Sequence, residues 1–128
     1  MSRLIEEIEL AALGEVELDE QGALVGSYCF PEGFLGFSGH FPGYPIVPAI
    51  VQVLVAQRLA QTRLGEGLRL QGVENAKFLL QIRPGQQIRV RCLLKPREEA
   101  TLVEARLSCG ETLAASFNLK FAPERPES

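Results

Sequence analysis

The stretch SGHFPGYPIVPAIVQVLVAQ, residues 38–57, joins a loop rich in glycine and proline to a long apolar segment. Pro48 suits the first turn of a helix, because the N–H group that proline lacks would have no partner there. Good helix formers follow until Gly65 and Gly67, and the first two turns are apolar nearly all round. The sequence therefore predicts a helix over residues 49–65 that is buried on most sides.

The segments on both sides of this helix are typical of antiparallel strands. Val16 and Leu18 alternate with acids, and the Asp-Glu-Gln-Gly turn at residues 19–22 leads into a second strand. Residues 2–10 have the apolar spacing of a short helix. The predicted strands are residues 14–18, 23–30, 68–82, 86–95, 101–109 and 111–121. In the last of them, Leu113, Ala115, Phe117, Leu119 and Phe121 are expected on one face.

This order of elements predicts an α+β hotdog fold, an antiparallel sheet wrapped around one long central apolar helix. We expect one domain over residues 1–122 and a disordered polar tail over residues 123–128. Two such protomers would pair their sheets edge to edge, because this removes exposed strand edges. The prediction is a homodimer, alone or as the unit of a higher oligomer.

Composition excludes several classes of function. A formal charge of −3 and a pI near 5.2 argue against a nucleic-acid or anionic-membrane binder. The three cysteines share no metal-binding spacing and the chain has a single histidine, so no metal site is expected. Acids occupy the place of a signal-peptide core near the start, and no window suits a membrane span. We expect a cytoplasmic protein.

The loop and helix start resemble the 3-hydroxyacyl-acyl-carrier-protein dehydratases of the FabA/FabZ group. The matching motif residues are Gly39, His40, Phe41, Pro42, Gly43, Pro45 and Pro48, followed downstream by Phe78, Pro84 and Gly85. The resemblance covers residues 34–90. Within the group the chain looks closest to short members associated with aryl-polyene synthesis, which carry a glutamine at the position of Gln52.

The resemblance implies that His40 is the catalytic base and that backbone N–H groups at the helix start polarise a thioester carbonyl. It also implies a tunnel for an acyl chain, carried on the phosphopantetheine of an acyl carrier protein, and no metal or redox cofactor. The residues expected to line the tunnel with His40 are Phe41, Gly43, Ala49, Gln52 and Leu54. Elimination of water needs a base at the α-carbon, an acid at the hydroxyl and donors for the thioester oxygen.

Two positions depart from the family pattern. Leu54 occupies the place of the helix carboxylate that serves as the acid, and the predicted helix contains no Asp or Glu. Ala49 replaces a glycine. Glu32 and Glu74, on either side of the helix in sequence, are the acids considered as substitutes. Gln52 can hydrogen-bond the 3-hydroxyl of a substrate, hold a water, or bond the neighbouring loop backbone.

Three interpretations of His40 stay open. The protein is a dehydratase or isomerase with its acid from elsewhere, a catalytically degenerate acyl-binding subunit, or a protein in which His40 only braces the loop. A hotdog thioesterase is a further alternative. Basic residues between residues 77 and 97 could attract an acidic carrier protein, although they are also ordinary solvent-facing strand positions.

Overall fold

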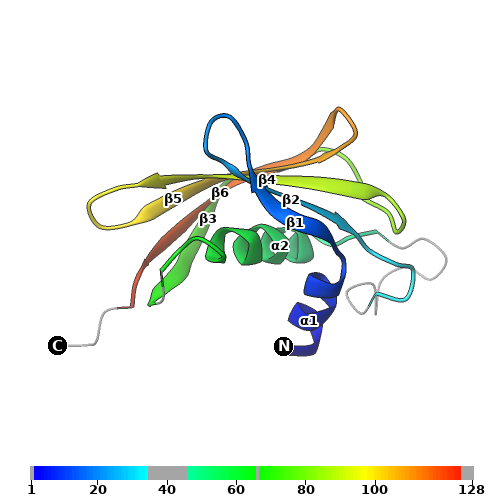
Figure 1. The fold of residues 1–128 in the computed structure, drawn as a ribbon, viewed down its shortest axis with the longest axis horizontal. Helices are drawn as coiled ribbons and strands as arrows, with labels where there is room; N and C mark the ends of the chain where they lie inside the picture. The colour runs from blue at the N-terminus through cyan, green and yellow to red at the C-terminus, as the bar shows by residue number, and fades with distance from the viewer. Residues whose placement is uncertain (1, 35–45, 66, 125–128) are drawn as a thin grey trace.

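The computed structural model describes residues 2–34, 46–65 and 67–124. Its main feature is one six-stranded antiparallel sheet with the strand order β1-β2-β4-β5-β6-β3. Both helices lie on the same side of this sheet, and the longer one runs beneath its centre (Figure 1). The predicted α+β arrangement of a sheet around a central helix is therefore confirmed. No helix of the described residues is long and apolar enough to cross a membrane.

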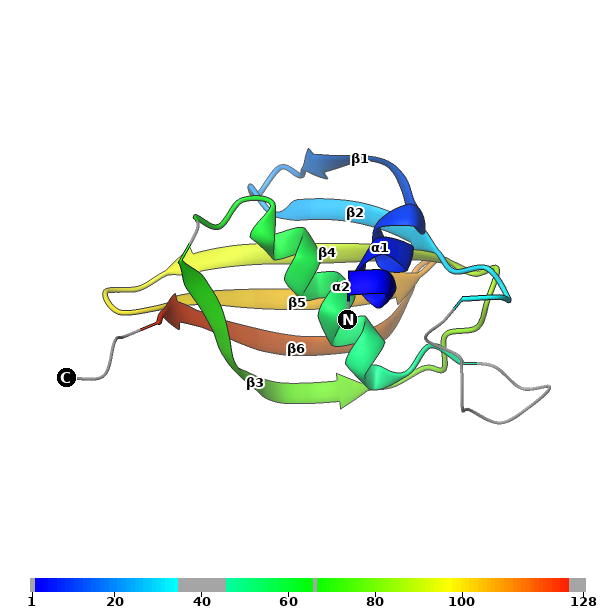
Figure 2. The same ribbon diagram turned by 90° about the horizontal axis from the view of Figure 1, so that it is seen from below.

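The N-terminal part follows the prediction closely. Helix α1, Ser2–Leu10, leads into the hairpin of β1, Ala12–Leu18, and β2, Leu24–Cys29. The predicted turn forms because the Asp19 carboxylate accepts hydrogen bonds from the backbone N–H groups of Gln21 and Ala23, both at 2.9 Å. Strand β1 is one edge of the sheet, and β3 is the other (Figure 2).

Helix α2, Ala49–Gln61, packs mainly against β4, with further contacts to β2 and β5. It ends four residues before the predicted Gly65, where the Thr62 hydroxyl donates to the Leu59 carbonyl at 2.7 Å. Seven of its residues are buried: Val51, Gln52, Val53, Val55, Ala56, Leu59 and Ala60. Ile50, however, is 64% exposed, so the first turn is open on one side.

Four strands follow: β3, Leu68–Phe78, β4, Gln87–Pro96, β5, Thr101–Cys109, and β6, Thr112–Pro123. Strand β3 ends at Phe78, before its predicted end at residue 82, because the N–H groups of Leu79 and Leu80 both donate to the Ala114 carbonyl and so leave the regular strand pairing. An irregularity in the β5–β6 register at Leu107/Ser108 leaves Ala114 as an extra residue on β6. The prediction that Leu113 shares one face with the next alternate residues of β6 was wrong, because the extra residue Ala114 separates it from Ala115 and leaves it 36% exposed.

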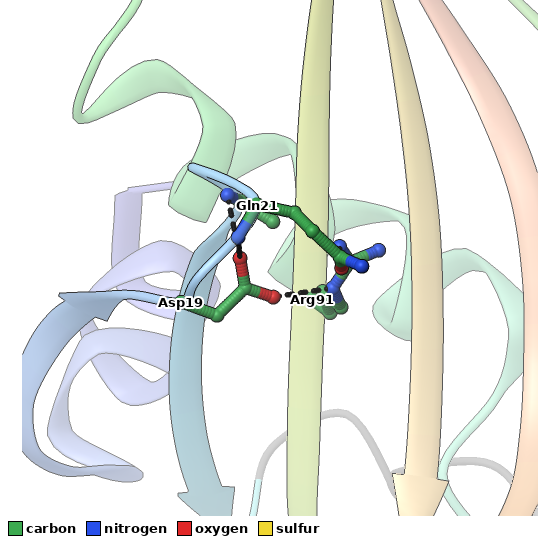
Figure 3. Close-up of polar contacts among 4 residues, drawn as sticks. Asp19, Gln21 and Arg91 are labelled. Carbon is green, nitrogen blue, oxygen red and sulfur yellow. Dashed lines mark hydrogen bonds and ion pairs between the residues drawn. The ribbon is translucent and has the colours of Figure 1, made fainter.

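Alternation along β4 divides its side chains between the two faces of the sheet. Val90 and Cys92 point into the core, and the Cys92 thiol reaches the Ala56 carbonyl of α2 at 3.6 Å. Arg91 lies on the opposite face, where its guanidinium meets Asp19 and Gln21 of the β1–β2 turn, both at 2.6 Å (Figure 3). The turn is thereby fixed to the middle of the sheet.

The C-terminal strand continues to Pro123, one residue beyond the predicted end of the domain. Residues 125–128 of the predicted tail lie outside the described part of the chain.

Candidate functional site

A pocket of about 280 Å³ lies between the start of α2 and the end of β3. Figure 2 shows these two ends side by side. The lining residues are Ile46, Val47, Pro48, Ala49, Gln52, Phe78, Leu79, Leu80 and Gln81. Apart from two glutamines and the backbone, this is an apolar surface, which suits an acyl chain.

The first turn of α2 offers backbone donors to this pocket. The N–H groups of Val51 and Gln52 donate hydrogen bonds to the Pro48 carbonyl, at 3.0 and 3.1 Å. The N–H groups of Ala49 and Ile50 donate to no described residue, and Pro48 provides no side-chain cap. Such free N–H groups at the positive end of a helix can stabilise an oxygen that gains negative charge.

Gln52 is the one polar residue in the core of the described chain, with 5% of its surface exposed. Its Nε2 donates to the Val47 carbonyl at 3.1 Å, so the predicted alternative of a bond to the neighbouring loop backbone is confirmed for the nitrogen. Its Oε1 is also buried, and no described residue donates to it. A buried carbonyl oxygen without a donor is unusual and needs an explanation.

The structure places the residues predicted from the sequence in three groups. Ala49 and Gln52 both line the pocket. Leu54 is half-buried, packs against the hydrophobic core and does not belong to the pocket lining. The predicted base, His40, and the predicted tunnel residues Phe41 and Gly43 lie outside the described residues.

The two acids considered as substitutes for the missing carboxylate do not belong to the lining of this pocket. Glu32 and Glu74 are both exposed, and neither lines it. Glu74 lies at an irregularity in the β3–β6 register, beside Asn75, whose φ of 53° is left-handed. Glu74 is therefore a solvent-exposed acid on an irregular part of β3.

The opposite wall of the pocket was not assigned to the site from the sequence. It consists of the end of β3 and the residues after it, from Phe78 to Gln81. Phe78, Leu79 and Leu80 are 43%, 60% and 38% exposed. The signal for this wall was the unbroken run Phe-Leu-Leu, because a strand with one solvated face would alternate apolar and polar residues.

Part of the basic charge between residues 77 and 97 is neutralised within the chain. Arg91 pairs with Asp19 at 2.6 Å, and Lys95 pairs with Glu104 at 2.5 Å. Lys77, Arg89 and Arg97 have no ion pair among the described residues. The region is thus less positive than its sequence suggests.

Cysteine chemistry does not belong to this site. Burial raises the pKa of the Cys92 thiol to about 12, which keeps it protonated and unreactive. The three cysteines are free and none lines the pocket. In the described ranges, no three side chains of His, Cys, Asp or Glu gather as a metal site would require.

Comparison with known proteins agrees with this geometry. The model of the ApeI-like family, described as ApeI dehydratase, matches residues 16–118. The 3-hydroxyacyl-acyl-carrier-protein dehydratase FabZ of Streptococcus pyogenes serotype M5 (strain Manfredo) is 36% identical over 97 residues, which cover 67% of this chain and 68% of FabZ. FabZ of Pelotomaculum thermopropionicum is 36% identical over 98 residues, covering 67% of both chains.

Solved structures show the same fold. The dehydratase heterocomplex ApeI:P from Xenorhabdus doucetiae matches with a TM-score of 0.73 and 21% identity, over 84% of this chain and 94% of that one. A phenylacetic acid degradation-related protein from Ralstonia eutropha JMP134, a candidate thioesterase, matches with a TM-score of 0.66 and 20% identity, over 89% and 86%. The chain is therefore a hotdog-fold protein of the 3-hydroxyacyl-acyl-carrier-protein dehydratase-like class. Within that class it belongs to the ApeI-like dehydratase family.

Proposed function

We propose that this protein dehydrates 3-hydroxyacyl thioesters carried by an acyl carrier protein, in fatty-acid or polyene-type lipid synthesis. The observation that carries the proposal is the apolar pocket at the uncapped start of α2, where the N–H groups of Ala49 and Ile50 are free of described partners. This start directly follows the histidine motif in sequence. Donors for a thioester oxygen and space for an acyl chain thus occur together.

In the proposed reaction, His40 removes a proton from C2 of the substrate while the thioester oxygen gains negative charge. The N–H groups of Ala49 and Ile50 stabilise that oxygen, which lowers the barrier to forming the enolate. The electron pair then forms the C2–C3 double bond as the 3-hydroxyl leaves. The hydroxyl takes up one proton, so the products are one water and one 2-enoyl thioester.

The proton for the leaving hydroxyl does not come from α2, because Leu54 has no proton to give. Solvent, or a carboxyl group of a partner subunit, supplies it in this proposal. Losing a general acid typically slows a reaction by about 10²- to 10⁴-fold, so turnover is slow compared with a site that has both groups. The reaction needs no metal or redox cofactor.

The proposed assembly is a homodimer, alone or within a higher oligomer, formed through the β3 edge. Exposed apolar side chains follow this edge and the residues just after it: Val73, Phe78, Leu79 and Leu80. Ile50, in the first turn of α2, is exposed as well. Pairing two β3 edges would cover these side chains and extend the sheet. We further propose that the protein works in the cytoplasm with an acyl carrier protein as its partner.

The second candidate function is an acyl-binding subunit that has lost dehydration. Leu54 favours it, because this residue removes the family acid while the pocket remains. ApeI:P is a heterocomplex, and a comparable heterocomplex would give this chain a homologous partner that carries the acid. The hotdog thioesterase alternative has only a likeness of fold in its favour.

The test is incubation of the purified protein with a 3-hydroxyacyl-acyl-carrier-protein, with the enoyl product measured by mass spectrometry. We expect conversion by the wild type and a loss of at least about 100-fold in His40→Ala. Binding of the acyl chain without conversion would favour the acyl-binding subunit. Release of free 3-hydroxy acid would favour the thioesterase and overturn the proposal.

A further inference from the structure

The half-paired amide of Gln52 is the most specific polar feature of the pocket. Gln52 is 5% exposed, and its Oε1 receives no hydrogen bond from a described residue. The surrounding walls are mostly apolar side chains, which cannot donate to it. Because Gln52 lines the pocket, a ligand that fills it lies against a side chain with a buried acceptor, and binds best when it carries a donor for that acceptor.

The orientation of this amide follows from its other contact. The Val47 carbonyl, 3.1 Å away, can only accept a hydrogen bond, so the Gln52 atom facing it must be the nitrogen. Val47 is itself held, because its N–H donates to the Ile82 carbonyl at 2.7 Å. The amide cannot turn over without losing its one bond, which leaves the oxygen as a fixed acceptor.

The position of Gln52 on α2 indicates which ligand atom can donate a hydrogen bond to its Oε1. Helical side chains lean toward the N-terminus, so the Gln52 amide extends back toward the first turn. The N–H groups of Ala49 and Ile50 lie in that turn and suit a thioester oxygen. An acyl chain held there places its C3 substituent a few bonds farther into the pocket, toward the amide.

We propose that Gln52 Oε1 accepts a hydrogen bond from the 3-hydroxyl of the acyl chain, so that the pocket selects 3-hydroxyacyl chains over saturated and 2-enoyl chains. This assignment rests on the proposed function, because it assumes an acyl thioester in the pocket. An amide oxygen cannot protonate the hydroxyl, so Gln52 binds and orients it. The 2-enoyl product has no C3 donor, leaves Oε1 unpaired and is held more weakly than the substrate.

The selectivity can be measured without turnover. Pantetheine amides replace the reactive thioester, and two matched ligands carry either a 3-hydroxyhexanoyl group, tested as each enantiomer, or a hexanoyl group. Isothermal titration calorimetry gives the dissociation constants. We expect the wild type to bind one hydroxy enantiomer about 10- to 100-fold more tightly than the hexanoyl ligand.

Two variants assign this preference to one side chain. Gln52→Met keeps the length of the side chain but removes the acceptor, and we expect the preference for the hydroxy ligand to disappear. Gln81→Met is the matched control, because Gln81 lines the same pocket but is exposed, and we expect the preference to remain. Circular dichroism checks that both variants fold.

Each outcome decides between the two proposals. Equal affinity of the wild type for the hydroxy and hexanoyl ligands would overturn the role of Gln52 while leaving dehydration to its own assay. A preference that survives in Gln52→Met would also overturn it. Failure of both ligands to bind the wild type would contradict the acyl pocket itself, and the role of Gln52 with it.

Discussion

Two polar clusters on opposite faces of the sheet differ in how completely they are paired. In the β1–β2 turn, Asp19 accepts two backbone hydrogen bonds and one from Arg91, whose guanidinium also reaches Gln21 (Figure 3). Beneath the sheet, Gln52 donates one hydrogen bond and its buried oxygen has no described donor. The partly buried cluster at the turn has its hydrogen-bonding groups paired, whereas the buried amide of Gln52 keeps one acceptor without a described donor.

This difference separates a structural role from a binding role. A fully paired cluster contributes to stability and has nothing left to offer a ligand. A buried acceptor without a donor costs free energy in the free protein, which a ligand can recover. Changes around the start of α2 should therefore alter activity, and changes at the turn should alter only stability.

The largest expected effect is a gain of dehydration activity from a substitution on α2, Leu54→Glu. Leu54 does not line the pocket of its own chain, so a carboxyl group at this position would supply the missing acid to the pocket of the partner subunit, and we expect the dehydration rate to rise by about 10²- to 10⁴-fold. Enoyl formation from a 3-hydroxyacyl-acyl-carrier-protein measures it. Leu54→Gln is the matched control, with a similar shape and no proton to give. Equal rates in the two variants would show that the missing acid does not limit the reaction.

The next effect concerns the N–H group of Ala49, which donates to none of the described residues. Proline is tolerated at the first position of a helix, and the extended Pro48, with ψ of 155°, can precede another proline. We expect Ala49→Pro to fold normally but to lower the dehydration rate by about 10²- to 10³-fold, because it removes one oxyanion donor. Ala49→Gly keeps the N–H group and should retain the rate. A fully active Ala49→Pro would exclude this donor.

The third prediction compares substitutions on the two edge strands, β3 and β1, by their effect on dimer formation. Val73 on β3 and Val16 on β1 are similarly exposed, at 41% and 43%. We expect Val73→Lys to weaken the dimer by at least about tenfold, because two like charges would meet across the β3 edges. Analytical ultracentrifugation measures the dissociation constant. Val16→Lys should leave it unchanged, and the reverse pattern would place the interface at β1.

The smallest expected effect is at the paired cluster of the β1–β2 turn. The hydrogen bond from Arg91 holds the pKa of Asp19 below its ordinary value of 3.8. A depressed carboxyl pKa stabilises the fold above the unfolded-state pKa, and this stabilisation is lost as the pH falls through the folded-state value. We therefore expect Arg91→Met to lower the urea midpoint slightly at neutral pH and to converge with the wild type in acid.

Arg89 provides the control for that measurement. It lies on the same strand, is exposed and forms no ion pair among the described residues. Arg89→Met should leave the urea midpoint unchanged at every pH, and both variants should keep full activity. A loss of dehydration in Arg91→Met would mean that the two clusters are coupled, against the separation of roles.

The arrangement of the elements could be predicted from the sequence because its patterns are local. The apolar run after Pro48 predicted the buried helix, and alternation predicted six strands. The bulge at Ala114 could not be predicted, since it depends on register with β5. It exposes Leu113 and ends β3 early, and so creates the wall from Phe78 to Gln81.

The candidate site was predicted in part. Ala49 and Gln52 were assigned from the family motif, and both line the pocket. Which atom of Gln52 is paired could not be predicted, because it depends on where the Val47 carbonyl lies after folding. The position of Leu54 away from the pocket lining likewise depends on the rotation of α2 against the sheet.

The measurement that tests the central claim most directly is exchange of deuterium from heavy water into C2 of a 3-hydroxyacyl-acyl-carrier-protein. It reports removal of the C2 proton, whichever group later protonates the hydroxyl. We predict deuterium at C2 with the wild type, detected by mass spectrometry, and none above background with His40→Ala. Equal exchange in both proteins, or none in the wild type, would contradict the assignment of this chain as a dehydratase with His40 as its base.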